Sequence, residues 1–348
     1  MLSFYPGPSK VHPEALEYIQ EAFEQGIVSI NHRSERFEKL LKATFDVLHQ
    51  KWNIPSNYSI YFVSSATEAW EIVIQSLVRE KSTHLYNGAF GKKWAHYASS
   101  VAESFEFSLD QSLAEIAQQI GPIKGDTLCL VQSETSNGTG QQIRRKDYQL
   151  ADDALVAVDA TSSMGGIELP WNEADVWLAS VQKCIGIPAG MGLLICSPKA
   201  LARAKELNRA TQYNDVLFLE ENRRMFQTQM TPNVLGIYLV YRLTQQLPSL
   251  SELHLATLAK MKVWTDFWDN QPDFSYLIEN SELRLPTVLA LTGNPEKIKQ
   301  LHKICLEKGI ELGKGYGEWK ETSFRIANFP SHTFEDIETL IQTIKNEL

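Results

Sequence analysis

Two residues of complementary chemistry follow two predicted strands. Asp159 ends the apolar run Leu155–Val158, and Lys183 comes shortly after the run Val176–Ala179. Leu193–Ile195 is a third run of this kind. Short apolar runs between turn residues are typical of buried parallel strands, and ligands of open α/β sheets bind at the carboxyl ends of such strands. We therefore expect Asp159 and Lys183 to face one crevice.

A carboxylate and an amine at one sheet edge match the needs of pyridoxal phosphate chemistry. The amine of Lys183 would form a Schiff base with the aldehyde of the cofactor, and the carboxylate of Asp159 would pair with its pyridine nitrogen. Each residue alone has a plainer interpretation, a surface lysine and a helix-capping aspartate. The spacing by itself leaves both interpretations open.

Composition and charge narrow the class of protein. A chain of 348 residues exceeds the usual size of one hydrophobic core, which predicts two domains. Its 43% hydrophobic and 22% charged residues are ordinary for a soluble globular protein. The net charge of −9 argues against nucleic acid or an anionic membrane as a partner. Without a signal peptide or an apolar run of about 20 residues, a cytoplasmic location is expected.

The four cysteines are far apart in the sequence and form no CxxC pair. Three of them lie in or beside apolar runs, so buried, reduced thiols are expected in place of disulfides, and no metal site is predicted. They are Cys129, Cys184, Cys196 and Cys305.

The first two thirds of the chain repeat a strand, a polar loop and a helix. Tyr58–Val63 reads as a strand, Ser64–Ala69 as a turn and Trp70–Val78 as a helix. Small hydroxylated residues at such a junction favour a phosphate cradle, because backbone N–H groups are free at a helix start. They are also ordinary helix caps. The repetition up to Cys196 predicts an α/β fold, a mostly parallel sheet covered by helices.

The pattern changes after residue 246. Pro198–Gln246 reads as helical with a break at Gln227–Asn233. Beyond it we predict a small α+β domain, joined by the N-terminal arm, so that residues 14–246 form the large domain and residues 1–13 and 247–348 the small one. Its predicted elements are a helix through Leu253 and Trp264, a strand Leu285–Leu291, a helix Pro295–Lys308, a glycine-rich loop Gly313–Gly317, a strand Ser323–Ala327 and a final helix Thr333–Leu348.

Nine short motifs, taken in order, resemble those of the class V aminotransferases, which are fold-type I pyridoxal-phosphate enzymes. Within that class the chain looks most like the phosphoserine aminotransferase branch. The motifs are YPGPS, NHRSERF, SSATEAWE, NGAFGKKW, ETSNGTG, VDATSSMGG, SVQKCIGIPAG, MFQTQMTP and FRIANF. The resemblance covers nearly the whole chain and implies a seven-stranded, mostly parallel sheet, pyridoxal 5'-phosphate as cofactor and transamination between an amino acid and a 2-oxo acid.

The resemblance also implies roles at the reacting centre. Lys183 would carry the cofactor and move the proton at the substrate Cα, and Asp159 would keep the pyridine nitrogen protonated. Phe90 matches the residue that stacks on the ring, and Thr135 matches the hydroxyl beside its phenolic oxygen. Arg325 matches the arginine that binds the substrate carboxylate through a bidentate fork.

Other matching residues imply a phosphate cup and a homodimer. Ala66, Thr67 and Gln182 match the part of the cup within one chain. Gln227 and Thr228 match the residues that a second subunit donates, although this chain has Gln-Thr where the branch usually has Asn-Thr. The resemblance therefore implies two active sites shared across a dimer interface.

The substrate is where this sequence departs from the branch. His32 and Arg33 match a pair that grips the substrate phosphate, but the second His-Arg pair before the carboxylate-binding arginine is missing. The corresponding stretch contains Glu318, which would repel a phosphate, and Lys320, which could replace part of the missing charge. Phosphoserine with 2-oxoglutarate is the first expectation.

Alternatives remain within and outside this chemistry. A transaminase of the alanine–glyoxylate or serine–pyruvate type shares the same internal chemistry. A non-catalytic protein that kept the fold would be expected to have lost Lys183, Asp159 or Arg325, and all three are present. A cysteine desulfurase needs a nucleophilic Cys near Gly313–Thr322, which contains none.

Overall fold

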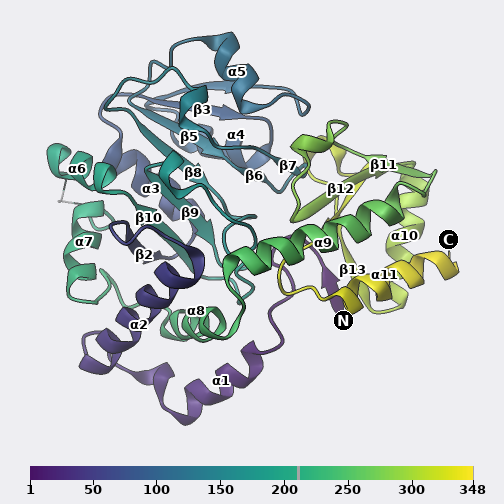
Figure 1. Cartoon of the computed structure of the whole chain (residues 1–348), viewed down its shortest axis with the longest axis horizontal. Helices are drawn as coiled ribbons and strands as arrows, with labels where there is room; N and C mark the ends of the chain where they lie inside the picture. Colours follow the sequence, from purple (N-terminus) through teal and green to yellow (C-terminus); the bar gives the residue numbers. More distant parts are fainter. Residues whose placement is uncertain (210–211, 348) are drawn as a thin grey trace.

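A seven-stranded sheet is the centre of the larger part of the molecule (Figure 1). The computed structural model describes residues 1–209 and 212–347. Across the sheet the order is β2 (Ser59–Val63), β10 (Gly192–Cys196), β9 (Val176–Ser180), β8 (Leu155–Asp159), β5 (Thr127–Val131), β3 (Ser82–Tyr86) and β4 (Ala102–Glu106). Five of these strands are buried along their whole length. This confirms the predicted α/β class and the mostly parallel, seven-stranded sheet.

The direction of one strand differs from the prediction. β10 contains the run Leu193–Ile195 that was expected to be parallel, but it pairs antiparallel with both β9 and β2. The reason is the connection: only residues 181–191 separate β9 from β10, and they form no helix. A parallel pair needs a longer crossover, usually a helix.

Helices cover both faces of this sheet, and alternate residues of each strand serve the two layers. In β2, Ile60 and Phe62 belong to one hydrophobic cluster while Tyr61 and Val63 belong to the other. The first cluster includes α1, α2, α5 and α8, and the second includes α3, α4, α6 and α7. Their bounds are α1 Ala15–Glu24, α2 Glu35–Trp52, α3 Ala66–Leu77, α4 Ala89–Tyr97, α5 Leu113–Ile120, α6 Pro198–Leu207, α7 Val216–Arg224 and α8 Val234–Gln246.

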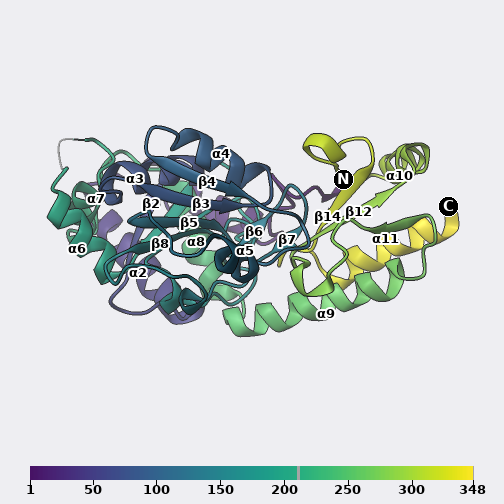
Figure 2. The same cartoon turned by 90° about the horizontal axis from the view of Figure 1, so that it is seen from above.

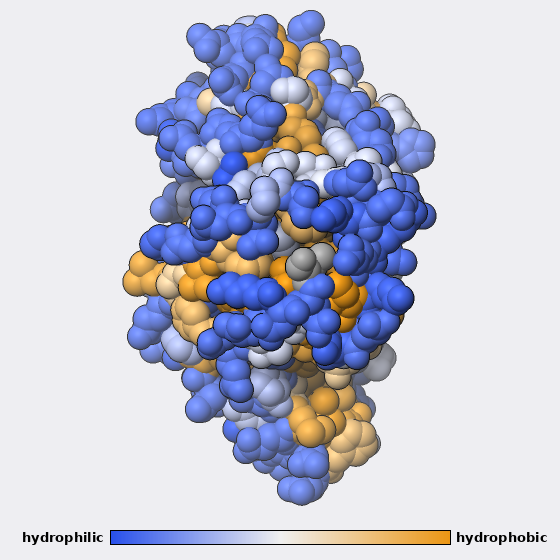
Figure 3. Space-filling model, turned by 90° about the vertical axis from the view of Figure 1, so that its right-hand side faces the viewer, coloured by the Kyte–Doolittle hydropathy of each residue, from blue (hydrophilic) through white to orange (hydrophobic). Residues whose placement is uncertain are grey.

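The smaller sheet has five strands in the order β1 (Leu2–Phe4), β13 (Ile310–Lys314), β14 (Ser323–Ala327), β12 (Val288–Gly293) and β11 (Phe274–Tyr276). α9 (Leu250–Trp268), α10 (Pro295–Glu307) and α11 (Phe334–Glu347) pack with it (Figure 2). The predicted last helix included Leu348, which lies outside the described residues. In Figure 3, which faces this end of the molecule, polar side chains cover much of the surface, and apolar side chains show between them in several patches.

Part of the predicted loop Gly313–Gly317 is a strand, since β13 runs through Gly313 and Lys314. A Cβ on Gly313 would lie 2.4 Å from Cδ of Pro6 and 2.9 Å from the carbonyl oxygen of Arg325. Glycine is therefore needed for the N-terminal arm to pass close to the strand, and here it does not mark a turn.

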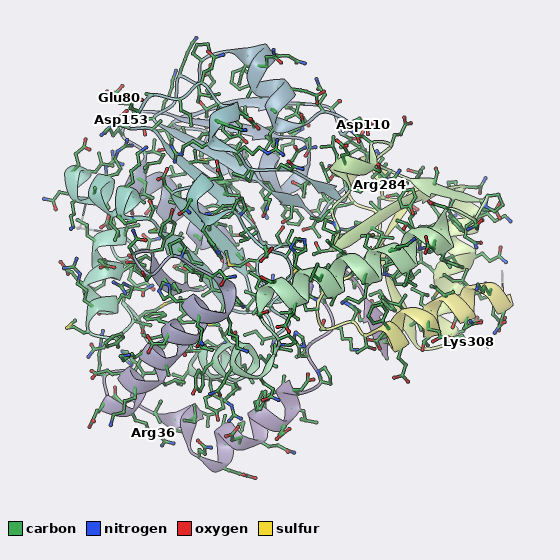
Figure 4. All side chains as sticks on the ribbon, viewed as in Figure 1. Arg36, Glu80, Asp110, Asp153, Arg284 and Lys308 are labelled. Atoms are coloured by element: carbon green, nitrogen blue, oxygen red, sulfur yellow. The ribbon has the colours of Figure 1, made fainter. Side chains whose placement is uncertain are left out.

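Several hydrogen bonds tie the smaller sheet to the larger part of the molecule, among them those of the N-terminal arm and of Asp110. The N-terminal arm leaves β1, which pairs with β13, and its Ser9 and His12 N–H groups donate to the carbonyls of Gln182 and Gly186 at 3.0 and 2.9 Å. On another side Asp110, near Arg284 in Figure 4, accepts from the N–H groups of Glu279 and Asn280. The proposed domain boundary at residues 246/247 falls between α8 and α9.

Two further features bear on the sequence predictions. All four cysteines are buried and free of disulfides. Among the described residues, no helix combines the length and the apolar character that crossing a bilayer requires.

Candidate active site

A cavity of about 190 Å³ lies where the strands β5, β8 and β9 end. It brings together seven of the residues predicted to hold a cofactor, which come from five separate segments. They are Ala66, Thr67, Phe90, Thr135, Asp159, Gln182 and Lys183. Gly7 and Pro8 of the N-terminal arm complete one side. The sequence prediction that Asp159 and Lys183 face one crevice therefore agrees with the geometry.

Lys183 is a buried amine held by a hydroxyl. Its Nζ donates to Thr135 Oγ1 at 2.7 Å and lies 4.8 Å from the centre of the Phe90 ring. Burial lowers the pKa of Lys183 to about 8, although the carboxylates of Asp159 and Glu134 oppose this shift. About a tenth of the amine is therefore neutral at pH 7, far more than for an ordinary lysine, and this form can act as a nucleophile or base.

Asp159 is the last residue of β8 and is also buried. Its Oδ2 accepts from Trp70 Nε1 at 2.8 Å, and its Oδ1 accepts from the Thr161 N–H at 2.8 Å. Burial raises the pKa of Asp159, and these two donors act against the rise. A cation placed at this carboxylate would stabilise its ionised form, as the pyridinium nitrogen would do.

The start of α3 forms the end of the cavity that suits an anion. The helix begins at Ala66, inside the segment predicted as a turn, because the Ser65 side chain caps it by accepting from the Glu68 N–H at 3.0 Å. The Ala66 N–H donates to Ser180 Oγ at 3.0 Å. A Cβ on Gly192 would lie 2.8 Å from the carbonyl carbon of Ser65, so glycine at this position lets the helix start approach the sheet closely.

Arg325 reaches the same site from the smaller sheet. It is buried in β14, and its Nη1 donates to the carbonyl oxygen of Thr135 at 2.8 Å while its Nε donates to that of Lys314 at 2.9 Å. Its guanidinium carbon lies 5.5 Å from the centre of the Tyr316 ring. Thr135 thus connects the two cations, since its hydroxyl binds Lys183 and its carbonyl binds Arg325.

The remaining predicted residues form a second cluster that does not line this cavity. Arg33 Nη1 donates to Gln227 Oε1 at 2.6 Å and to Asn222 Oδ1 at 3.0 Å. Thr228 donates its hydroxyl to the Met230 carbonyl at 2.6 Å, and His32 is half-buried beside Arg33. The geometry therefore groups Arg33 with Gln227, as residues of one surface region.

The structure adds residues that the sequence interpretation missed. Trp70 was read only as a helix residue, yet it holds Asp159, and Ser162 pairs its hydroxyl with that of Thr135 at 2.5 Å. Tyr316 lies between Phe90, at 5.7 Å between ring centres, and Arg325. A signal for Trp70 was its place one turn after the capped helix start, where its side chain can turn back toward the sheet.

A larger cavity, of about 690 Å³, shares no lining residue with this one. Its lining includes three arginine or lysine side chains, one histidine and three glutamates, and two of the glutamates already have donors within the chain. These are Glu168, which accepts from Ser251, and Glu173, which accepts from the Arg145 N–H. We assign the active site to the smaller cavity because the amine, the carboxylate and the helix start meet there.

The donor set of the smaller cavity fits pyridoxal phosphate. An amine suits its aldehyde, a buried carboxylate suits its ring nitrogen, and a helix start suits its phosphate. The groups that would hold these three parts of the cofactor are Lys183, Asp159 and the start of α3 at Ala66 and Thr67.

Known proteins resemble the chain over its whole length. The family model for class-V aminotransferases matches residues 2–319. A phosphoserine aminotransferase of Rhodococcus opacus is 27% identical over 97% of this chain and 92% of that protein. The crystal structure of a phosphoserine aminotransferase from Cytophaga hutchinsonii is 32% identical, with a TM-score of 0.92 over 100% of this chain and 99% of that one.

A more distant structure shares the fold. The alanine–glyoxylate aminotransferase of a Nostoc species is 22% identical, with a TM-score of 0.85 over 99% of this chain and 94% of that chain. The match of the family model to most of the chain, together with the fold, shows that this protein belongs to the class-V aminotransferase family.

Proposed function

We propose that this chain transfers an amino group from phosphoserine to 2-oxoglutarate, or in the reverse direction. Family membership makes it an aminotransferase that uses pyridoxal phosphate, an amino acid and a 2-oxo acid. When bound, this cofactor supplies an aldehyde for amines and a ring that stabilises negative charge at the substrate Cα. The observation that carries the assignment of the site is the meeting of Lys183, Asp159 and the start of α3 at one cavity, with Arg325 bound to the carbonyl of Thr135, which also lines it.

We assign the roles as follows. Lys183 attaches the cofactor and, in its neutral form, moves the proton at the substrate Cα, because burial keeps its pKa near 8. Asp159 holds the ring nitrogen, and Trp70 and Thr161 keep its carboxylate in place. Arg325 binds the substrate carboxylate, and the arm residues Gly7 and Pro8 exclude water from one side.

Support for phosphoserine comes from His32 and Arg33 and from the names of the relatives. The residues in the other half of the predicted phosphate site, Glu318 and Lys320, do not favour phosphoserine. Glu318 is exposed on a short 3-10 helix, Gly317–Trp319, and so is turned to solvent. Lys320 lines a separate cavity with His302 of α10, which argues against the earlier idea that it replaces the missing charge.

Tyr316 favours a substrate without a phosphate group. It faces Arg325 from the segment where the resemblance would place a cationic pair, and an aromatic ring supplies bulk but no charge. A small uncharged side chain, as in alanine or serine, suits such a neighbour. The second candidate is therefore an alanine–glyoxylate or serine–pyruvate type of transaminase.

The two candidates are separated by kcat/KM for phosphoserine, serine and alanine in wild type and in Arg33→Ala. The matched control is Arg36→Ala (Arg36 is labelled in Figure 4), an exposed arginine three residues further along the chain. Its guanidinium donates to the Gln25 carbonyl, whereas that of Arg33 donates to Gln227. If phosphoserine is the substrate, wild type has a much higher kcat/KM for phosphoserine than for serine or alanine. This difference should be lost in Arg33→Ala and kept in Arg36→Ala. Equal or better use of alanine or serine, unaffected by Arg33→Ala, contradicts phosphoserine.

We further propose a homodimer in which each copy completes the site of the other. Arg33, Gln227 and Thr228 lie together but do not line the cavity of their own chain, so a second copy is the proposed recipient. Gln227 and Thr228 lie between α7 and α8, and two large apolar side chains close to them in the sequence are exposed. These are Tyr213 and Met225, each 53% exposed.

Mixing two inactive variants, Lys183→Ala and Thr228→Ala, tests this sharing. Hybrid dimers contain one site with both residues intact, so activity should return after verified subunit exchange. Activity that stays at the level of the separate variants contradicts a shared site.

A further inference from the structure

Glu134 is a buried carboxylate at the active site to which the roles above assign nothing. It is 1% exposed and directly precedes Thr135, the residue that binds both Lys183 and Arg325. Taking a carboxylate out of water is costly, so its position needs compensating donors.

Those donors come mainly from the start of another element. Glu134 Oε2 accepts from the N–H groups of Phe90 and Gly91 in α4 at 3.2 and 3.1 Å. Its Oε1 accepts from the N–H and the hydroxyl of Ser136 at 3.1 and 2.5 Å. Burial raises the pKa of Glu134, and the hydrogen bonds from Ser136, Gly91 and Phe90 oppose this rise, so the donor set favours the ionised form. The positive end of a helix also favours a negative charge there.

The sequence of α4 is adapted to receive this carboxylate from outside. Its N-cap residue is Gly88, which has no side chain to cap the helix. A Cβ on Gly88 would lie 2.2 Å from Cγ and 2.5 Å from Cδ of Glu134. Serine or aspartate, the usual N-caps, would therefore displace Glu134. Ser136 completes the cap by accepting from the Ala89 N–H at 3.0 Å.

This cap fixes the part of α4 that faces the reacting amine. Phe90 is the second residue of the helix, and its ring lies 4.8 Å from Lys183 Nζ. The charge of Glu134 also acts on both cations of the site, favouring protonated Lys183 and Arg325. The charged and titratable groups that act on Lys183 are Asp159, Glu134, Arg325 and Cys184.

We propose that Glu134 is a positioning residue of the transaminase. It holds Phe90 against the site through the start of α4, and it supplies a negative charge, in addition to that of Asp159, that favours the protonated form of the Lys183 amine. The inference rests on the proposed function, because in that reaction Lys183 acts as the nucleophile and the base.

The test uses the cofactor-free protein, so that it does not depend on turnover. Glu134→Gln removes the charge at nearly constant size, and Glu134→Asp keeps the charge on a shorter side chain. The matched control is Glu115→Gln, which changes the same residue type in the exposed capping box of α5. Two quantities are measured: hydrogen exchange of the Phe90 and Gly91 amides, and the pH dependence of Lys183 acetylation by acetic anhydride, read on its peptide by mass spectrometry.

In Glu134→Gln the Phe90 and Gly91 amides should exchange about tenfold faster or more, as expected for losing a hydrogen bond to a charged group. The midpoint of Lys183 acetylation should move to lower pH, because removing a nearby negative charge favours the neutral amine. Glu134→Asp should restore the midpoint toward wild type, and Glu115→Gln should change neither quantity. An acetylation midpoint in Glu134→Gln equal to that of wild type overturns the proposal. A glutamate that only capped the helix would leave this midpoint unchanged when it is replaced.

These outcomes are separable from the fate of the proposed function. If wild type transfers no amino group from any donor tested, the proposed function fails while the acetylation result still decides the effect of Glu134 on Lys183. If Glu134→Gln does not fold, the exchange of the Phe90 and Gly91 amides in Glu134→Asp decides, because the shorter side chain should lose these hydrogen bonds. Faster exchange than in Glu115→Gln supports the positioning role, and exchange equal to that of wild type contradicts it.

Discussion

Replacing Thr135 by valine removes the hydroxyl that connects Lys183 with its surroundings and keeps the shape of the side chain. The hydroxyl accepts from Lys183 Nζ at 2.7 Å and pairs with Ser162 Oγ at 2.5 Å, and both partners are buried. Leaving a buried polar group without its partner costs about 1–3 kcal/mol. We therefore expect Thr135→Val to lower the free energy of unfolding of the cofactor-free protein by about 1–3 kcal/mol.

The same loss should slow the reaction. Lys183 would no longer be held at a fixed position, and a barrier increase of about 1.4–2.7 kcal/mol corresponds to a rate about 10–100-fold lower. The measurements are denaturant unfolding followed by fluorescence, and kcat with the best amino donor.

Thr139→Val is the matched control. Thr139 is equally buried in the same polar loop, but its hydroxyl has no partner among the described residues. Its replacement should leave stability unchanged within about 0.5 kcal/mol or raise it, because no hydrogen bond is lost. If Thr135→Val unfolds at the same denaturant concentration as Thr139→Val, the hydrogen bonds of Thr135 do not hold the site as argued.

Three further predictions follow from the geometry. Trp70→Phe removes the donor to Asp159 and should weaken cofactor binding about tenfold, measured by equilibrium dialysis; an unchanged Kd would contradict this role. Because the pKa of Lys183 is about 8, the rate of covalent cofactor attachment should rise up to about pH 8 and then level off, whereas continued growth toward about pH 10 would indicate an ordinary lysine. Burial raises the pKa of every thiol, so Ellman's reagent should find no reactive thiol in the folded protein and four after unfolding, and a rapidly reacting native thiol would count against the core packing.

The sequence was sufficient to predict the main sheet and its crevice, because both follow from local patterns. Apolar runs that end in Asp159 and Ser180 specify buried strands, and strand ends meet at one edge. The antiparallel direction of β10 was missed although the short connection 181–191 implied it. Gly313 was taken as a turn because its role, allowing Pro6 to pass, depends on a segment distant in sequence.

The contacts within the site were harder to foresee for the same reason. Trp70 reaches Asp159 across 89 residues of sequence, and Glu134 reaches α4 across more than 40. The position of Trp70 one turn after a capped helix start was a local signal, but it does not identify Asp159 as the partner, and nothing local marks Glu134. Arg33 and Gln227 were both singled out, but their direct contact follows only from the fold.

We infer that Lys183 holds the cofactor because of its position in the cavity and not only because its pKa is lowered. Lys260 provides an internal comparison: it is also buried with a pKa lowered to about 8, but its Nζ donates to the carbonyls of Phe329 and His332, away from the cavity. The protein loaded with pyridoxal phosphate is reduced with borohydride, digested and mapped by mass spectrometry. The account predicts the reduced cofactor on the Lys183 peptide alone, whereas label on Lys260, on any other lysine in place of Lys183, or on none would contradict it.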